Sequence, residues 1–62
     1  MIVYTVEETR ESEGYWGITE VIAIYGSKEK ALAKAKEKEE LYKYNDYYVT
    51  AYDTESGEIV ND

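Results

Sequence analysis

The sequence predicts an α+β domain in which a three- to four-stranded antiparallel sheet carries one helix on one face, in the order ββαβ or ββαββ. Two segments rich in β-branched and aromatic residues flank a short polar loop, as in an antiparallel hairpin. A run of Ala, Leu, Lys and Glu follows, and these are strong helix formers. A second aromatic segment then provides a third strand. With 62 residues, we expect a single domain spanning 1–62.

The first two strands are predicted at residues 2–8 and 15–25. In the first, Ile2, Tyr4 and Val6 alternate with other residues and therefore share one side of the strand. Residues 9–14 are mostly polar and end in glycine, which predicts the hairpin loop. The second strand is the most apolar segment of the chain.

A helix is predicted from Lys28 to about Lys43. Ser27 is a good N-cap, and Glu29 in the first turn suits the positive end of the helix dipole. One stripe of the helix should lie against the sheet, and its members are Ala31, Leu32, Ala35 and Tyr42. Small residues in this stripe predict a close approach of helix and sheet.

The chain after the helix predicts a third strand, followed by a shorter fourth one. Asn45 and Asp46 end the helix, and residues 47–53 form the third strand. Residues 54–57 have turn composition, and residues 58–60 form a short fourth strand.

This arrangement resembles small proteins that are common in bacteriophage and prophage genomes and mostly of unknown function. The matching segments are a first strand Val3-Tyr4-Thr5-Val6-Glu7-Glu8, a strand-to-helix junction from Tyr25 to Ala31, and an aromatic third strand. The resemblance covers nearly the whole chain, but its motifs are structural. It implies the fold and a phage origin, and it transfers no catalytic residue.

Charge is distributed unevenly along this acidic chain, whose net charge is −7. Residues 1–27 sum to −4, residues 28–43 to +2, and residues 44–62 to −5. The helix holds six of the seven basic residues, interleaved with glutamates, so direct nucleic-acid binding is not expected. The acidic surface serves solubility, or it meets a basic partner. The candidate acidic residues are Glu7, Glu11, Glu13, Asp53 and Glu55.

The second strand is apolar on both sides, which is the main functional indication. Val21, Ala23 and Tyr25 should face the helix, while Ile22 and Ile24 should face away from it. A single helix covers one face of a sheet, so the other face would be left without cover. The predicted apolar interface consists of Tyr4, Trp16, Ile18, Ile22, Ile24, Tyr48 and Tyr52, together with the Ile2 and Val6 side of the first strand. Alternatively, a bulge near Glu20 shifts the register and turns some of these residues inward.

Catalytic chemistry is not indicated. The chain has no Cys and no His, which removes the usual nucleophile–base pairs and the usual zinc ligands. We therefore expect no enzyme activity, no metal and no cofactor. No apolar run is long enough to span a membrane, and the N-terminal segment lacks the basic start of a signal peptide, so we expect a cytoplasmic protein.

These observations favour a small acidic interaction protein, homodimeric and phage-derived, that binds and inhibits a larger bacterial protein such as a defence enzyme. Nucleic-acid mimicry is an alternative, in which the acidic residues occupy a basic DNA- or RNA-binding groove. A further alternative is a module that sequesters a small ligand between two copies, with Trp16 and tyrosines forming the cleft. The last alternative is a designed domain without a natural function.

Overall fold

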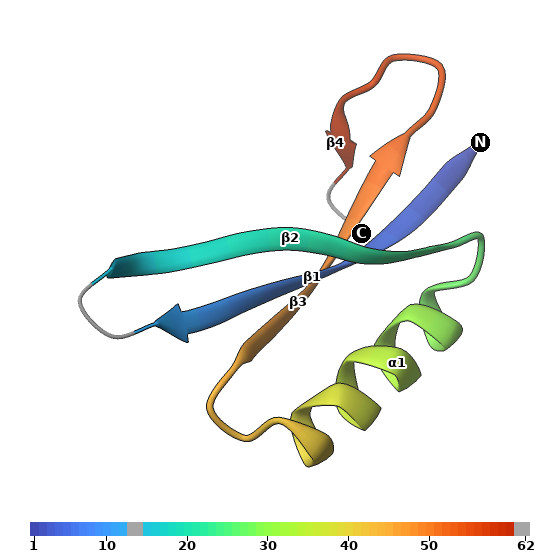
Figure 1. The fold of residues 1–62 in the computed structure, drawn as a ribbon. Coiled ribbons are helices and arrows are strands. Elements are labelled where there is room, and N and C mark those ends of the chain that lie inside the picture. Colours follow the sequence, from blue (N-terminus) through green and yellow to red (C-terminus); the bar gives the residue numbers. More distant parts are fainter. Residues whose placement is uncertain (13–14, 61–62) are drawn as a thin grey trace.

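The fold is a four-stranded antiparallel sheet with one helix, seen in a computed structural model that describes residues 1–12 and 15–60 (Figure 1). The elements are β1 (Ile2–Ser12), β2 (Tyr15–Tyr25), α1 (Lys28–Leu41), β3 (Asp46–Asp53) and β4 (Ile59–Val60). The strand order across the sheet is β2-β1-β3-β4. The α+β class and the ββαββ order predicted from the sequence are therefore confirmed.

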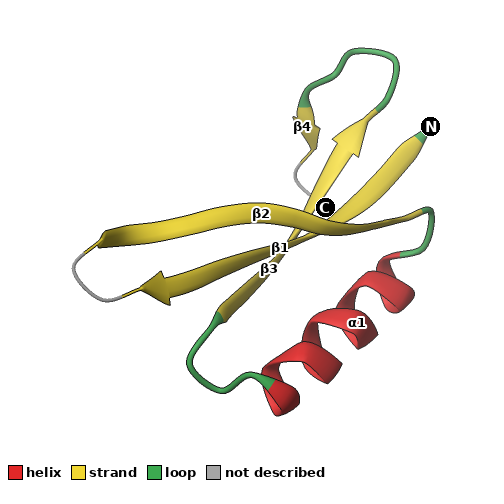
Figure 2. Cartoon of the chain, in the orientation of Figure 1, coloured by secondary structure: helices red, strands yellow, loops and turns green. Residues whose placement is uncertain are grey.

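The hairpin of β1 and β2 is longer than the sequence predicts, because β1 continues past residue 8 to Ser12. The extension is held by cross-strand pairs between polar residues: Thr9 lies opposite Thr19, and their hydroxyl oxygens are 2.8 Å apart. Arg10 lies opposite Ile18. Figure 2 shows that this end of the hairpin projects well beyond the helix.

The helix begins and ends for identifiable local reasons. Ser27 is the N-cap, and its hydroxyl accepts a hydrogen bond from the Lys30 backbone N–H at 3.4 Å. At the other end the Tyr42 backbone N–H donates to the Lys38 carbonyl at 2.8 Å. The Lys38 ammonium also lies 5.5 Å from the centre of the Tyr42 ring, a cation–π contact. The backbone of Tyr42 leaves the helical conformation, with φ −127° and ψ 80°, so the helix ends at Leu41, two residues before the predicted end.

The core between α1 and the sheet is small. Its buried apolar residues are Val6, Ala31, Ala35, Tyr47 and Ala51. Because three of these are alanines, helix and sheet lie close together, as the sequence predicts. The predicted helix stripe is only half right, since Leu32 and Tyr42 are both 50% exposed.

A bulge in β2 changes which residues reach this core. Val6 pairs with Ala23 and Glu7 pairs with Val21, so Ile22 is the extra residue on β2. Ile22 packs against the core together with Ala23, whereas Val21 turns to the opposite side. The sequence-based assignment of Ile22 to the uncovered face, and of Val21 to the helix side, is therefore wrong.

The assignment of the first strand is also corrected. Val6 is fully buried, and Tyr4 packs against the core, so the even-numbered side of β1 faces the helix. The expectation that this side is uncovered followed from the register that lacks the bulge. With the bulge in place, the even-numbered residues of β1 and the residues of β3 that pair with them lie together on the helix side of the sheet.

Candidate functional site: the open face of the sheet

The side of the sheet opposite α1, here called the open face, carries several apolar side chains without cover. The register sets Val3, Tyr52 and Ile59 side by side across β1, β3 and β4. Val21 and Tyr48 lie on either side of β1, with Glu7 between them. The most exposed apolar members are Val21 at 55%, Ile24 at 63%, Tyr48 at 53% and Ile59 at 66%.

The centre of the open face is polar and fixed in place. Thr5 lies between Ile24 and Thr50 and is only 7% exposed. Its hydroxyl is 3.1 Å from Glu7 Oε1 and 3.4 Å from the Thr50 carbonyl. Donation to the carboxylate holds Glu7 between its apolar neighbours, so the face presents a positioned negative charge.

The positive counterpart lies on the helix side. Arg10 is the only basic side chain among the described residues of the sheet, and it pairs with Glu8 at 3.2 Å and with Glu20 at 2.9 Å. The Tyr47 hydroxyl donates to Glu8 at 2.8 Å and accepts from the Asn45 side chain at 3.3 Å. The open face is thus apolar and acidic, with no cation of its own.

Two sets of groups have altered titration, and neither lies on the open face. Burial raises the pKa of the Tyr47 phenol, and its hydrogen bond to the Glu8 carboxylate acts in the same direction. On the helix surface, the hydrogen bond between Lys34 and Glu37, 2.7 Å long, raises the pKa of the lysine and lowers that of the glutamate. An exposed pair of this kind adds little to stability.

The structure gathers only part of the predicted apolar interface on the open face. Ile24, Tyr48 and Tyr52 lie there. Ile18 is 58% exposed, but it opposes Arg10 and therefore lies on the helix side, beyond the end of the helix. The side chain of Trp16 lies outside the described part of the chain.

The predicted acidic residues are not brought together. Glu7 lies on the open face, whereas Asp53 and Glu55 lie at the turn between β3 and β4. Tyr48, the neighbour of Glu7, lies five positions along β3 from Asp53, a distance of roughly 17 Å in an extended strand. Glu13 and the side chain of Glu11 lie outside the described part of the chain. The described members of the predicted acidic set thus form no continuous row.

Sequence reasoning missed Val21 and Ile59 as members of the open face. Val21 was missed because the favoured assignment used a regular strand. The alternative, a bulge near Glu20 that turns some of these residues inward, is the one found, with the bulge at Ile22. Ile59 follows a turn in which Gly57 adopts a positive φ of 74° and its N–H donates to the Asp53 carbonyl at 2.7 Å. The glycine marks the turn in the sequence. The side of the sheet on which Ile59 lies, however, can be assigned only when the register of β4 is known.

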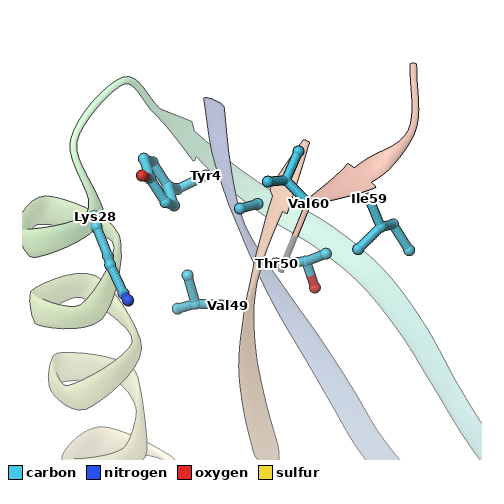
Figure 3. Close-up of a pocket in the computed structure, with 7 residues that line it drawn as sticks. Tyr4, Lys28, Val49, Thr50, Ile59 and Val60 are labelled. Carbon is cyan, nitrogen blue, oxygen red and sulfur yellow. The ribbon is translucent and has the colours of Figure 1, made fainter. Parts of the chain in front are cut away.

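Two surface hollows are candidates for small-molecule sites. One, of about 250 Å³, lies beside β4 and the start of α1 and is lined by Tyr4, Lys28, Val49, Val60 and neighbours (Figure 3). Its volume is below the roughly 300 Å³ at which ligand pockets begin. The other, of about 320 Å³, is lined only by the consecutive residues 40–45, so no second element forms its wall. Of the open-face residues named above, Thr50 and Ile59 line the first hollow, and none lines the second.

Within the described residues there is no cluster of three or more acidic or other metal-ligating side chains, and no helix long and apolar enough to cross a membrane. Comparison of the chain with protein-family models, with curated proteins and with solved structures finds no match. The site is therefore assessed from its own geometry.

Proposed function

We propose that this protein acts by binding a partner protein through the open face of its sheet, and that the partner presents an apolar centre bordered by Lys or Arg. The observation that carries this proposal is the arrangement of Val21, Glu7 and Tyr48, two exposed apolar side chains on either side of a held carboxylate. Exposed apolar groups that lie together on a small protein mark interaction surfaces.

The charge of the face determines the chemistry of the partner. Covering Val21 and Tyr48 also covers Glu7, and a carboxylate removed from water without a cation is strongly destabilising. Because Arg10 is engaged on the other side of the sheet, the cation must come from the partner. A second copy that docks through its own open face brings no cation with it, so we assign the face to a different protein.

Apolar contacts give the binding energy, and charge gives the specificity. Full burial of a Val or Ile side chain is worth about 1.5–3 kcal/mol. Side chains that are already partly covered, such as Val21, Ile24 and Ile59, would each contribute about 1 kcal/mol. The resemblance to phage proteins favours a larger bacterial protein as the partner, with inhibition as the consequence of binding.

The test compares two lysine substitutions of equal chemistry. Immobilised wild-type protein is used to capture proteins from a bacterial lysate, and each captured protein is purified and its affinity measured by calorimetry. Tyr48→Lys, on the open face, should weaken binding by more than tenfold, the effect of a central interface residue. Leu41→Lys, at the end of α1 and 65% exposed, should leave the affinity unchanged. Equal affinities for the two variants would refute the open face as the site.

A second comparison tests the charge argument and separates it from nucleic-acid mimicry. Glu7→Gln keeps an oxygen that can accept from Thr5, so the local structure should persist while the charge is lost. We expect weaker binding and a smaller dependence on salt concentration. Competing DNA should not displace the partner. Displacement by DNA, with Tyr48→Lys still binding, would favour mimicry over the proposed interface.

A further inference from the structure

We propose that the outer edge of β2 pairs antiparallel with β2 of a second copy, around a two-fold axis close to Ile18. This contact lies on the sheet edge and is independent of the open face. It concerns the backbone of β2 and the side chain of Ile18, neither of which the proposed partner binding uses.

The edge of β2 has unmet hydrogen-bonding capacity. In the strand order β2-β1-β3-β4, β2 pairs only with β1, and no strand within the described residues lies on its other side. β2 spans 11 residues, which is long for an edge strand. A long edge strand presents a row of unpaired N–H and C=O groups that serves as a template for another strand.

The composition of β2 favours a second copy as the strand that pairs there. The chain has a net charge of −7, so two copies repel each other over most of their surface. From Tyr15 to Tyr25, however, Glu20 is the only charged residue, and Arg10 compensates it at 2.9 Å. β2 has no Lys and no Pro, the residues that natural edge strands use to prevent pairing.

The position of the axis follows from the bulge and from the exposure of Ile18. The register of β2 against β1 shifts at Ile22 and again between Ile18 and Tyr15, so the pairing must be centred on the regular stretch between the two shifts, from Ile18 to Val21. An axis at Glu20 would set two like charges opposite each other, which is unfavourable. An axis at Ile18 sets two isoleucines opposite each other, and it covers a side chain that is 58% exposed because the helix does not reach it.

The consequence is one continuous sheet shared by two copies. Antiparallel pairing around an axis perpendicular to the sheet keeps both helices on the same side. The two open faces then lie side by side on the other side of the sheet. A dimer of this kind also adds contacts to a domain whose buried core includes three alanines.

Single-cysteine variants test the contact directly, because the chain contains no cysteine of its own. Residues directly opposite in an antiparallel pair have Cα atoms about 4.5–5.5 Å apart, within the range that a disulfide bridges. Ile18→Cys should therefore form a covalent dimer rapidly when a mild oxidant such as diamide is added. Ile24→Cys is the matched control on the same strand, with a similar exposure of 63%. Its two copies would lie about 40 Å apart, 12 residues along the pair.

The expected result is covalent dimerisation at least about tenfold faster for Ile18→Cys than for Ile24→Cys, as a raised effective concentration requires. Light scattering should show the wild-type mass rising towards that of a dimer with concentration, and Ile18→Lys should remain monomeric. A wild-type monomer at every concentration, with equal cross-linking rates for the two cysteine variants, would overturn the proposal. So would a dimer that survives Ile18→Lys and is lost in Tyr48→Lys. Partner binding that fails with Tyr48→Lys alone leaves the β2 contact intact, so the two proposals fail separately.

Discussion

Replacing Val6 with Ala tests the register on which the description of both sheet faces depends. Val6 is fully buried, pairs with Ala23 and Val49, and belongs to the core with Ala31 and Ala35. The substitution removes two methyl groups' worth of buried apolar surface, about 1.6 kcal/mol at about 0.8 kcal/mol per group. A residual cavity adds to this, because the neighbouring side chains relax only partly. The expected loss is about 2–3 kcal/mol.

That loss is a large fraction of the total stability. Domains have a free energy of unfolding of about 0.05–0.15 kcal/mol per residue, which gives about 3–9 kcal/mol for a chain of this length. A loss of about 2 kcal/mol lowers the midpoint of urea unfolding by about 2 M and Tm by about 8–16 °C. Far-UV circular dichroism follows the transition through the signal of α1.

The control is the same substitution at Val21, on the neighbouring strand. Val21 is 55% exposed on the open face, so Val21→Ala should change the free energy of unfolding by less than about 0.5 kcal/mol. In a register without the bulge, Val21 faces the helix and Val6 faces solvent, and the order of the two effects is reversed. Equal or reversed losses would therefore refute the register given above.

Three further changes have defined outcomes. Tyr47 has a raised pKa in the folded state, so folding favours its neutral form, and Tm should fall as the pH rises above about 10; Tyr47→Phe should remove its share of that fall. Ser27→Ala removes the N-cap and should lower the free energy of unfolding by about 0.5–1 kcal/mol in a urea titration. Gly17→Ala should destabilise the hairpin in thermal unfolding, because a Cβ there would lie 2.8 Å from the Thr9 methyl group, whereas Gly26→Ala has open space and should be nearly neutral.

Local sequence rules predict the order of the helix and strands, but they do not predict which residues of β2 lie on which face of the sheet. The helix start, the ββαββ order and the turn before β4 follow from Ser27, from the change in residue periodicity and from Gly57. These features depend on residues close together in the chain. The register of β2 instead depends on how Ile22 packs against α1, a contact that forms only in the folded domain. A single inserted residue reverses the side of every residue beyond it.

The C-terminal end of β1 is a second feature that local sequence rules do not predict. The polar residues from Thr9 onward predict a loop, since they lack an apolar alternation. In the folded hairpin Thr9 and Arg10 each find a partner on β2, a hydroxyl at 2.8 Å and the Glu20 carboxylate at 2.9 Å. Cross-strand polar pairs stabilise a strand as apolar pairs do. They become visible only once the register of the two strands is known.

The bulge at Ile22 links the core to both proposed surfaces. A regular β2 would place Ile22 and Ile24 together on the open face, with Val21 beneath the helix. The extra residue lets Ile22 and Ala23 contact the core together, and it turns Val21 outward next to Glu7. Together with the second register shift, between Ile18 and Tyr15, this irregularity limits the regular part of β2 to Ile18–Val21. Deleting Ile22 should therefore destabilise the core, because its contact there is lost, but leave Val21 on the open face, because the pairs Val6–Ala23 and Glu7–Val21 then follow one another in a regular strand. Partner binding should persist under conditions where the shortened chain still folds, and its loss in a folded deletion variant would contradict this register.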